Sequence, residues 1–227
     1  MSSRPDPDQL IRHLQANTFF AQLDGPTLHE LAQGAIWREY AAGEAIFWEG
    51  ERVTGLYYLH SGWIKVVKVA PNGREQVLRY LEAGDMFNEV GAFSSQSNPA
   101  TAVALEPVGI WLLKREAITQ LLQQRPDFAQ HVIENMAERV QYLVTLVADL
   151  SLRSVIGRLA RLILEDADGN NLHRPQWYTQ SELAARLGTV PDVIQRALRT
   201  LESDNIIEVQ RHLIRIQDRQ ALTQIAT

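Results

Sequence analysis

The spacing of apolar residues switches near Arg115 from a period of about two to a period of about 3.6, and this switch constrains the fold most strongly. Before it, short segments rich in β-branched and aromatic residues are separated by turn signals. After it, apolar residues keep the helical period as far as about Asp166. The chain is therefore expected to join a β domain to a helical region, which is an α+β architecture.

The β region is expected to form a small barrel or a jelly roll, because many short strands with regular punctuation are typical of these architectures. One or two short helices are predicted ahead of it, in residues 8–34. Asn72-Gly73 predicts a hairpin with a type I′ turn, since both residues tolerate the positive φ that this turn requires. The strands are predicted at residues 45–48, 56–60, 62–69, 75–80, 101–105 and 109–114.

Within the helical stretch, five apolar residues recur at alternating spacings of four and three. Such a narrow stripe is expected where a helix packs against a parallel copy of itself. About two heptads are too few to hold a dimer alone. The alternative is that the stripe packs on the chain's own β domain. The predicted dimerisation residues are Met136, Val140, Leu143, Val147 and Leu150.

Composition excludes several classes of function. The chain has no cysteine, which excludes disulfides, thiolate catalysis and cysteine-ligated zinc or iron–sulfur centres. The first residues lack the layout of a signal peptide, and no apolar run approaches the roughly 20 residues that span a bilayer. We expect a cytoplasmic protein with no membrane partner. No nucleophile, metal-ligand set or phosphate-binding glycine loop is evident, so we expect no enzyme activity.

The net charge of −5 is unevenly distributed along the 227 residues. Residues 152–227 carry ten arginines against nine acidic residues, whereas all three lysines lie earlier in the chain. Arginine suits phosphate and guanine because its planar fork donates two parallel hydrogen bonds. The alternative is that these arginines only solvate helix faces. This distribution is compatible with a nucleic-acid partner for the last third of the chain.

Two capping boxes stand ten residues apart, at Thr179–Glu182 and Thr189–Asp192. In each, the threonine hydroxyl can accept from the amide three residues on, which marks a helix start. Gly188 falls where a tight turn between two short helices needs positive φ. An apolar alternation follows at residues 206–216 and is interrupted at 210–212, which predicts a hairpin. Paired helices followed by a hairpin predict a winged helix-turn-helix that binds DNA.

The residues expected to contact DNA share the exposed side of the second helix or the tip of the hairpin. In a helix-turn-helix, the start of the second helix enters the major groove. Arginine pairs with guanine, glutamine with adenine, and aspartate accepts from cytosine. An alternative partner for Arg196 is Asp192, four residues earlier. The candidates for base contacts are Thr189, Pro191, Asp192, Gln195 and Arg196, and those for phosphate contacts are Arg199 and Arg211.

Three motifs resemble the CRP/FNR superfamily of transcription regulators: Tyr57–Gly62, Gly84–Phe93 and Gln180–Leu201. The resemblance covers nearly all of the chain after about residue 15. It implies a β-roll of the cyclic-nucleotide-binding type at 1–125, a central dimerisation helix at 126–151 and a winged helix-turn-helix at 152–227. It also implies a homodimer that binds a two-fold symmetric operator on double-stranded DNA, and it favours an activator that contacts RNA polymerase.

The sequence departs from the cyclic-AMP-binding members of that family at two places. Glu89 matches the glutamate that holds the ribose, but Asn98-Pro99 stands where those members carry an Arg-Ser pair for the cyclic phosphate. A buried phosphate without a cationic partner is costly, which argues against cyclic AMP. Pro191-Asp192 also replaces an Arg-Glu pair, so the operator is expected to differ. The effector-pocket candidates are Phe87, Asn88, Glu89, Val90, Asn98, Pro99, Ala100 and Thr101.

No cofactor is firmly implied. A haem-based sensor would need an axial histidine, and a surface role is the alternative for each candidate. A further alternative is a pocket filled by side chains that needs no effector. A different class of function also stays open, in which a ligand-sensing module regulates a protein partner without sequence-specific DNA binding. The histidines considered as ligands are His13, His29, His60 and His131.

Overall fold

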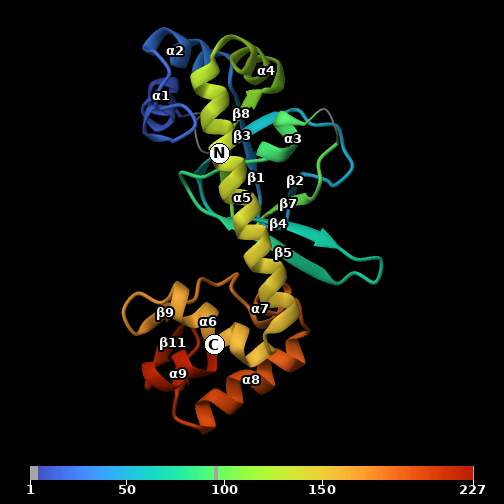
Figure 1. The fold of residues 1–227 in the computed structure, drawn as a ribbon, viewed down its shortest axis with the longest axis vertical. Coiled ribbons are helices and arrows are strands. Elements are labelled where there is room, and N and C mark those ends of the chain that lie inside the picture. Colours follow the sequence, from blue (N-terminus) through green and yellow to red (C-terminus); the bar gives the residue numbers. More distant parts are fainter. Residues whose placement is uncertain (1–4, 95–96, 227) are drawn as a thin grey trace. The chain divides into compact units, whose positions relative to one another are not determined.

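The computed structural model describes residues 5–94 and 97–226, and its contacts divide the chain into two compact units. The first unit comprises the chain up to residue 68 and residues 79–141. The second comprises residues 69–78 and 142–227. The division falls inside one long helix, α5 (Pro126–Leu152), so residues 142–152 of this helix belong with the carboxy-terminal unit. Figure 1 labels the elements along the chain.

Most of two four-stranded sheets lies in the amino-terminal unit, with strand orders β1-β8-β3-β6 and β2-β7-β4-β5, and residues 75–78 of β5 belong to the second unit. Helices α1, α2 and α4 gather beside the start of α5 (Figure 1). The elements are α1 (Pro7–Ala16), α2 (Gly25–Gly34), β1 (Ile36–Tyr40), β2 (Ala45–Phe47), β3 (Gly55–Ser61), β4 (Ile64–Val69), β5 (Glu75–Leu81), β6 (Met86–Phe87), α3 (Glu89–Phe93), β7 (Thr101–Ala104), β8 (Val108–Lys114) and α4 (Arg115–Gln124).

Alternation along β3 explains how one strand serves two cores. Tyr57 and Leu59 join the core between the sheets, whereas Leu56 and Tyr58 join the core beneath the helices. Successive side chains of a strand point to opposite faces. Because both faces of β3 are covered, the strand reads as a continuous apolar run from Leu56 to Leu59.

The predicted strands of this unit are confirmed, but the turn chosen for Asn72-Gly73 is wrong. Gly73 has a φ of 81°, whereas Asn72 is not among the described residues with positive φ. The amide of Gly73 donates to the carbonyl of Ala70 at 2.8 Å, so the turn closes one residue earlier than a two-residue I′ loop would. Strands β1 and β6 and the short helix α3 were not predicted.

The carboxy-terminal unit packs four of the described helices and a small sheet around one apolar core. The sheet has the order β10-β11-β9 and is antiparallel. No helix among the described residues is long and apolar enough to cross a membrane. After α5 the elements are α6 (Val155–Asp166), β9 (Asn171–His173), α7 (Gln180–Arg186), α8 (Pro191–Ser203), β10 (Ile207–Val209), β11 (Leu213–Ile216) and α9 (Arg219–Ala226).

Candidate nucleic-acid interface

Helix α7 begins where the first capping box predicted. The Thr179 hydroxyl accepts from the amide of Glu182 at 3.3 Å. The helix ends at a turn in which Gly188 has a φ of 63°. A left-handed residue there lets the amide of Thr189 donate back to the carbonyl of Ala184 at 2.9 Å. The short turn therefore joins α7 to α8, as the sequence predicted.

The second capping box does not form, and this part of the prediction is wrong. The N-cap of α8 is Val190, which has no side-chain cap hydrogen bond. Pro191 is the first helical residue, and its fixed φ suits this position. Thr189 therefore lies one residue too early to cap the helix.

Helix α8 buries one face and presents the other. Its buried residues are Ile194, Ala197, Leu198 and Leu201, which join the core of the unit. Val190 is 46% exposed because it precedes the helix. The polar candidates on the opposite face are all exposed, and they are Asp192, Gln195, Arg196 and Arg199.

Arg196 does not form the side-chain pair with Asp192 that was considered as an alternative. Its Nε donates instead to the main-chain carbonyl of Asp192, at 3.4 Å. This long bond to a neutral acceptor leaves most of the guanidinium donors without a partner among the residues that the structure describes. The side chain is therefore able to meet a nucleobase.

The hairpin after α8 is confirmed. Glu208 pairs with Arg215 and Val209 with Ile214, and the Gln210 amide closes the turn on the carbonyl of Leu213 at 2.8 Å. Arg211 lies exposed in this turn. The third strand, β9, was not among the predicted strands; it pairs with β11 and broadens the wing.

A polar cluster not found from the sequence fixes α7 against the end of α6. Arg186 donates to both carboxylate oxygens of Asp166, with Nη2 to Oδ1 at 3.0 Å. The Tyr178 hydroxyl donates to Asp166 at 3.2 Å and accepts from Arg186 at 3.0 Å. Burial raises the pKa of Tyr178, so the phenol stays protonated. These three residues are 12 and 8 positions apart, and no local spacing relates them.

The effector-loop candidates lie around a pair of asparagines. Asn88 has a left-handed backbone (φ 68°), and its amide donates to Asn98 Oδ1 at 3.1 Å and to the Gly55 carbonyl at 3.2 Å. The Asn98 amide in turn donates to the Trp48 carbonyl at 3.3 Å. Asn98 is 3% exposed, so its amide braces the loop. Phe87, Ala100 and Thr101 are also buried, whereas Val90 and Pro99 are exposed.

Arg79, on β5, holds the glutamate that would bind a ribose. Its Nη1 lies 3.2 Å from Glu89 Oε1, and its Nη2 lies 3.4 Å from Asp85 Oδ1. Burial raises the pKa of Glu89, although Arg79 and Arg139 oppose this shift. The positive charge therefore lies beside the ribose position, while Asn98 supplies none at the phosphate position. These residues do not fit the cyclic-phosphate arrangement that the resemblance implies.

The histidines considered as haem ligands are dispersed, except for one pair. His29 contacts Gln33 and His131 contacts Glu134, both on exposed helix surfaces. His13 stacks on Tyr58 and meets the edge of His60, with ring centroids 5.9 Å apart. Among the described residues, no group of three or more histidine, aspartate or glutamate side chains could hold a metal ion.

The stripe on α5 is largely exposed in the single chain. Val140 is 59% exposed, Leu143 36% and Val147 62%. Only Met136 packs partly on the core of the amino-terminal unit. The same side of α5 exposes two residues that the sequence analysis missed, Ile133 at 69% and Val144 at 64%. Ile133, Val140 and Val147 are spaced by seven residues, a signal that the sequence already contained.

Comparison with known proteins agrees with this architecture. A family model for the cyclic nucleotide-binding domain matches residues 37–125, and a model for the Crp-like helix-turn-helix domain matches residues 157–225. The chain belongs to the CRP/FNR superfamily of transcription regulators. It is therefore a DNA-binding regulator with a cyclic-nucleotide-binding-like domain, and the relatives that it matches are regulators rather than enzymes.

Two CRP/FNR relatives are described as cAMP-activated global transcriptional regulators. The protein from Mycobacterium tuberculosis is 27% identical over 194 residues, which cover 83% of this chain and 87% of the relative. The protein from Pasteurella multocida is 29% identical over 192 residues, which cover 80% and 90%. Among solved structures, FixK2 from Bradyrhizobium japonicum has a TM-score of 0.74 at 21% identity, covering 85% of this chain and 98% of its own.

A second solved structure has the same fold, but its description names a different signal. It is CLP from Xanthomonas campestris, described as a c-di-GMP-responsive global regulator, with a TM-score of 0.73 at 19% identity. The match covers 85% of this chain and 99% of CLP. The fold of this CRP/FNR chain is therefore found in proteins described with different effectors.

Proposed function

We propose that this chain is a homodimeric transcription activator that reads a two-fold symmetric operator through α8. The observation that carries the proposal is the division of α8 into a buried apolar face and an exposed face with Gln195, Arg196 and Arg199. These side chains follow Pro191 at the start of the helix, the part that enters the major groove in a helix-turn-helix. Arg211 in the wing turn is placed for a phosphate.

The proposal assigns different roles to two arginines, and this difference provides the test. Arg196→Ala is expected to cost about 1 to 3 kcal/mol on the specific operator and little on random DNA, because the arginine reads a base. Arg199→Ala is the matched control, since loss of a phosphate contact weakens binding to both DNAs alike. Equal losses on both DNAs for Arg196→Ala would reduce this residue to a phosphate contact. Binding of the unmodified protein is expected to weaken steeply as salt rises.

The dimer is proposed to form through Met136, Val140, Leu143, Val147 and Leu150, extended by Ile133 and Val144. Most of these side chains are exposed in the single chain. Their exposure supports a dimer seam, made of these seven residues and their copies, rather than packing on the chain's own β domain. The proposed organisation keeps a sensor domain at 1–125, a dimerisation helix at 126–151 and a reader domain at 152–227. We place the protein in the cytoplasm, where it reaches DNA and contacts RNA polymerase.

The proposed effector is a small molecule other than cyclic AMP, or none. Two observations support this: Glu89 is already paired with Arg79, and Asn98 uses its amide to brace the loop. We expect cyclic AMP to leave the affinity for the operator unchanged in a fluorescence anisotropy titration, with no binding heat in calorimetry. Cyclic AMP that tightens operator binding would contradict this assignment.

A further inference from the structure

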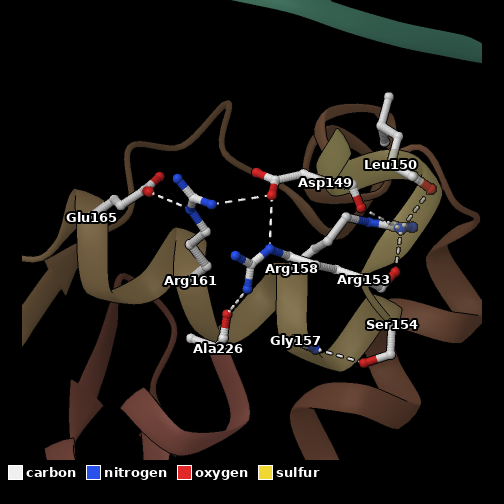
Figure 2. A network of polar contacts seen from close by, with 9 residues as sticks. All are labelled: Asp149, Leu150, Arg153, Ser154, Gly157, Arg158, Arg161, Glu165 and Ala226. Atoms are coloured by element: carbon white, nitrogen blue, oxygen red, sulfur yellow. Dashed lines mark hydrogen bonds and ion pairs between the residues drawn. The ribbon is translucent and has the colours of Figure 1, made fainter. Parts of the chain in front are cut away.

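Three arginines converge where α5 ends and α6 begins (Figure 2). A single oxygen, Asp149 Oδ1, accepts from Arg153 Nε at 2.8 Å and from Arg161 Nη1 at 3.1 Å. Arg153 also donates to the carbonyl of Ala226 in α9, and Arg161 donates to Glu165 at 2.6 Å. One carboxylate of α5 is thus tied to α6 directly, and through Arg153 to α9.

The third arginine caps the end of α5 from the neighbouring helix. Arg158 Nη1 donates to the carbonyls of Arg153 at 2.8 Å, Leu150 at 3.2 Å and Asp149 at 3.4 Å (Figure 2). The last carbonyls of a helix lack partners within that helix. The hydroxyl of Ser154, which caps α6, accepts from the Gly157 amide at 3.1 Å. The Arg153 carbonyl and the Ser154 hydroxyl, in the two-residue break between the helices, are therefore both hydrogen-bonded to groups of α6.

The central members of this network are shielded from solvent. The side chain of Asp149 is 21% exposed, that of Arg153 28% and that of Arg161 32%. Charge-assisted hydrogen bonds are stronger than neutral ones, and partial burial reduces screening by salt. Glu165 is 54% exposed and contributes less. We therefore expect Asp149 to hold the angle between α5 and α6.

Both sides of this junction carry parts of the proposed function, and both lie in the carboxy-terminal unit. The seam residues Leu143, Val147 and Leu150 belong to residues 142–227, together with the reader. The apolar side of α6 shares one core with α8. In addition, a Cβ placed on Gly188 would lie 2.8 Å from Leu150 Cδ2. The end of the seam is therefore next to the turn that precedes α8.

A two-fold DNA reader must present two copies of its recognition helix at a fixed separation. Half-sites of such proteins lie about 34–36 Å apart, which is one helical turn of DNA. One inserted base pair moves a half-site by about 3.4 Å and turns it by about 34°. If the connection between the dimer seam and the winged helix-turn-helix is stiff, the dimer binds the altered spacing weakly. If the connection is loose, the dimer can adjust to the altered spacing.

We propose that Asp149 is a positioning residue that sets the half-site spacing of the operator. It acts through Arg153 and Arg161, which fix α6, and hence α8, on the part of α5 that pairs with its copy. The inference rests on the proposed dimeric DNA binding. It goes further because it assigns spacing selectivity to residues that touch neither DNA nor the partner.

The test compares operators that differ only in spacing, with the full-length protein at fixed salt. Insertion of one base pair between the half-sites is expected to weaken operator binding by the unmodified protein about tenfold or more. This loss is similar to that caused by a mismatched base pair. Asp149→Ala is expected to reduce this ratio to about threefold or less, with affinity for random DNA unchanged. Asp149→Glu, which restores a carboxylate, is expected to regain selectivity.

Glu165→Gln is the matched control, because it removes a carboxylate from the exposed edge of the same network. If Asp149→Ala fails to fold or dimerise, Arg161→Gln removes the same link from the α6 side. An Asp149→Ala or Arg161→Gln dimer with the spacing ratio of the unmodified protein would overturn the inference alone. An unmodified protein that binds no two-fold operator would overturn the proposed function, and the inference with it.

Discussion

Truncation of one exposed valine on α5 is expected to weaken the dimer measurably. Val147→Ala removes two methyl groups, each worth about 0.8 kcal/mol when fully buried. The change occurs twice in a two-fold dimer. Val147 is 62% exposed in the single chain, so roughly that share of its surface is available for burial in the seam. The expected loss is about 2 kcal/mol of association free energy, or about 30-fold in the dimer Kd.

Sedimentation equilibrium of the purified protein over a range of concentrations measures this loss directly. Val69→Ala is the matched control, because it removes the same two groups from a residue that is 48% exposed and lies outside α5. The control is expected to leave the dimer Kd unchanged. An equal Kd for Val147→Ala and Val69→Ala would refute the reasoning, since the seam would then not bury Val147.

Two further predictions concern single residues. Gly188→Ala is expected to lower the free energy of unfolding in urea by about 1 to 2 kcal/mol, because residue 188 has a φ of 63°. Gly34→Ala is the control, because Gly34 lies at a helix end with free space around it, and this change should cost nothing. Equal losses of stability for the two variants would contradict this prediction. Burial and the neighbouring His13 lower the pKa of His60 in the folded chain. As the pH falls, the unfolded chain therefore binds a proton at His60 before the folded chain does, and the stability of the fold decreases below about pH 6.5. His60→Gln should flatten this fall between about pH 7.5 and 5.5, and an unchanged slope in urea midpoints would argue against it.

The order of elements could be predicted because local patterns and tertiary packing agree in most of the chain. The stripe on α8 and the glycine turn before it specify the same arrangement as the core that buries them. The strand segments were predictable for the same reason, since the continuous apolar run of β3 between turn signals matches its burial on both faces. One error occurred where a single residue decides a boundary. Val190 rather than Thr189 precedes α8, because Pro191 occupies the first helical position.

The charged parts of the candidate site were harder to predict, because their partners are distant in sequence or carry no motif. Arg79 lies on strand β5, ten residues before Glu89, which begins helix α3. Arg186 lies 20 residues after Asp166 and on another helix. Only the tertiary fold brings such pairs together. The Asp149 link to Arg161, across the break between α5 and α6, is of the same kind.

Enrichment of DNA from sheared genomic fragments by the purified protein tests the central claim most directly. The recovered fragments are expected to share a two-fold symmetric sequence whose half-sites are centred about one helical turn apart. Arg196→Ala should lose this enrichment while retaining random DNA at low salt. Recovery of fragments with no shared sequence, or with a shared sequence that lacks two-fold symmetry, would contradict the account.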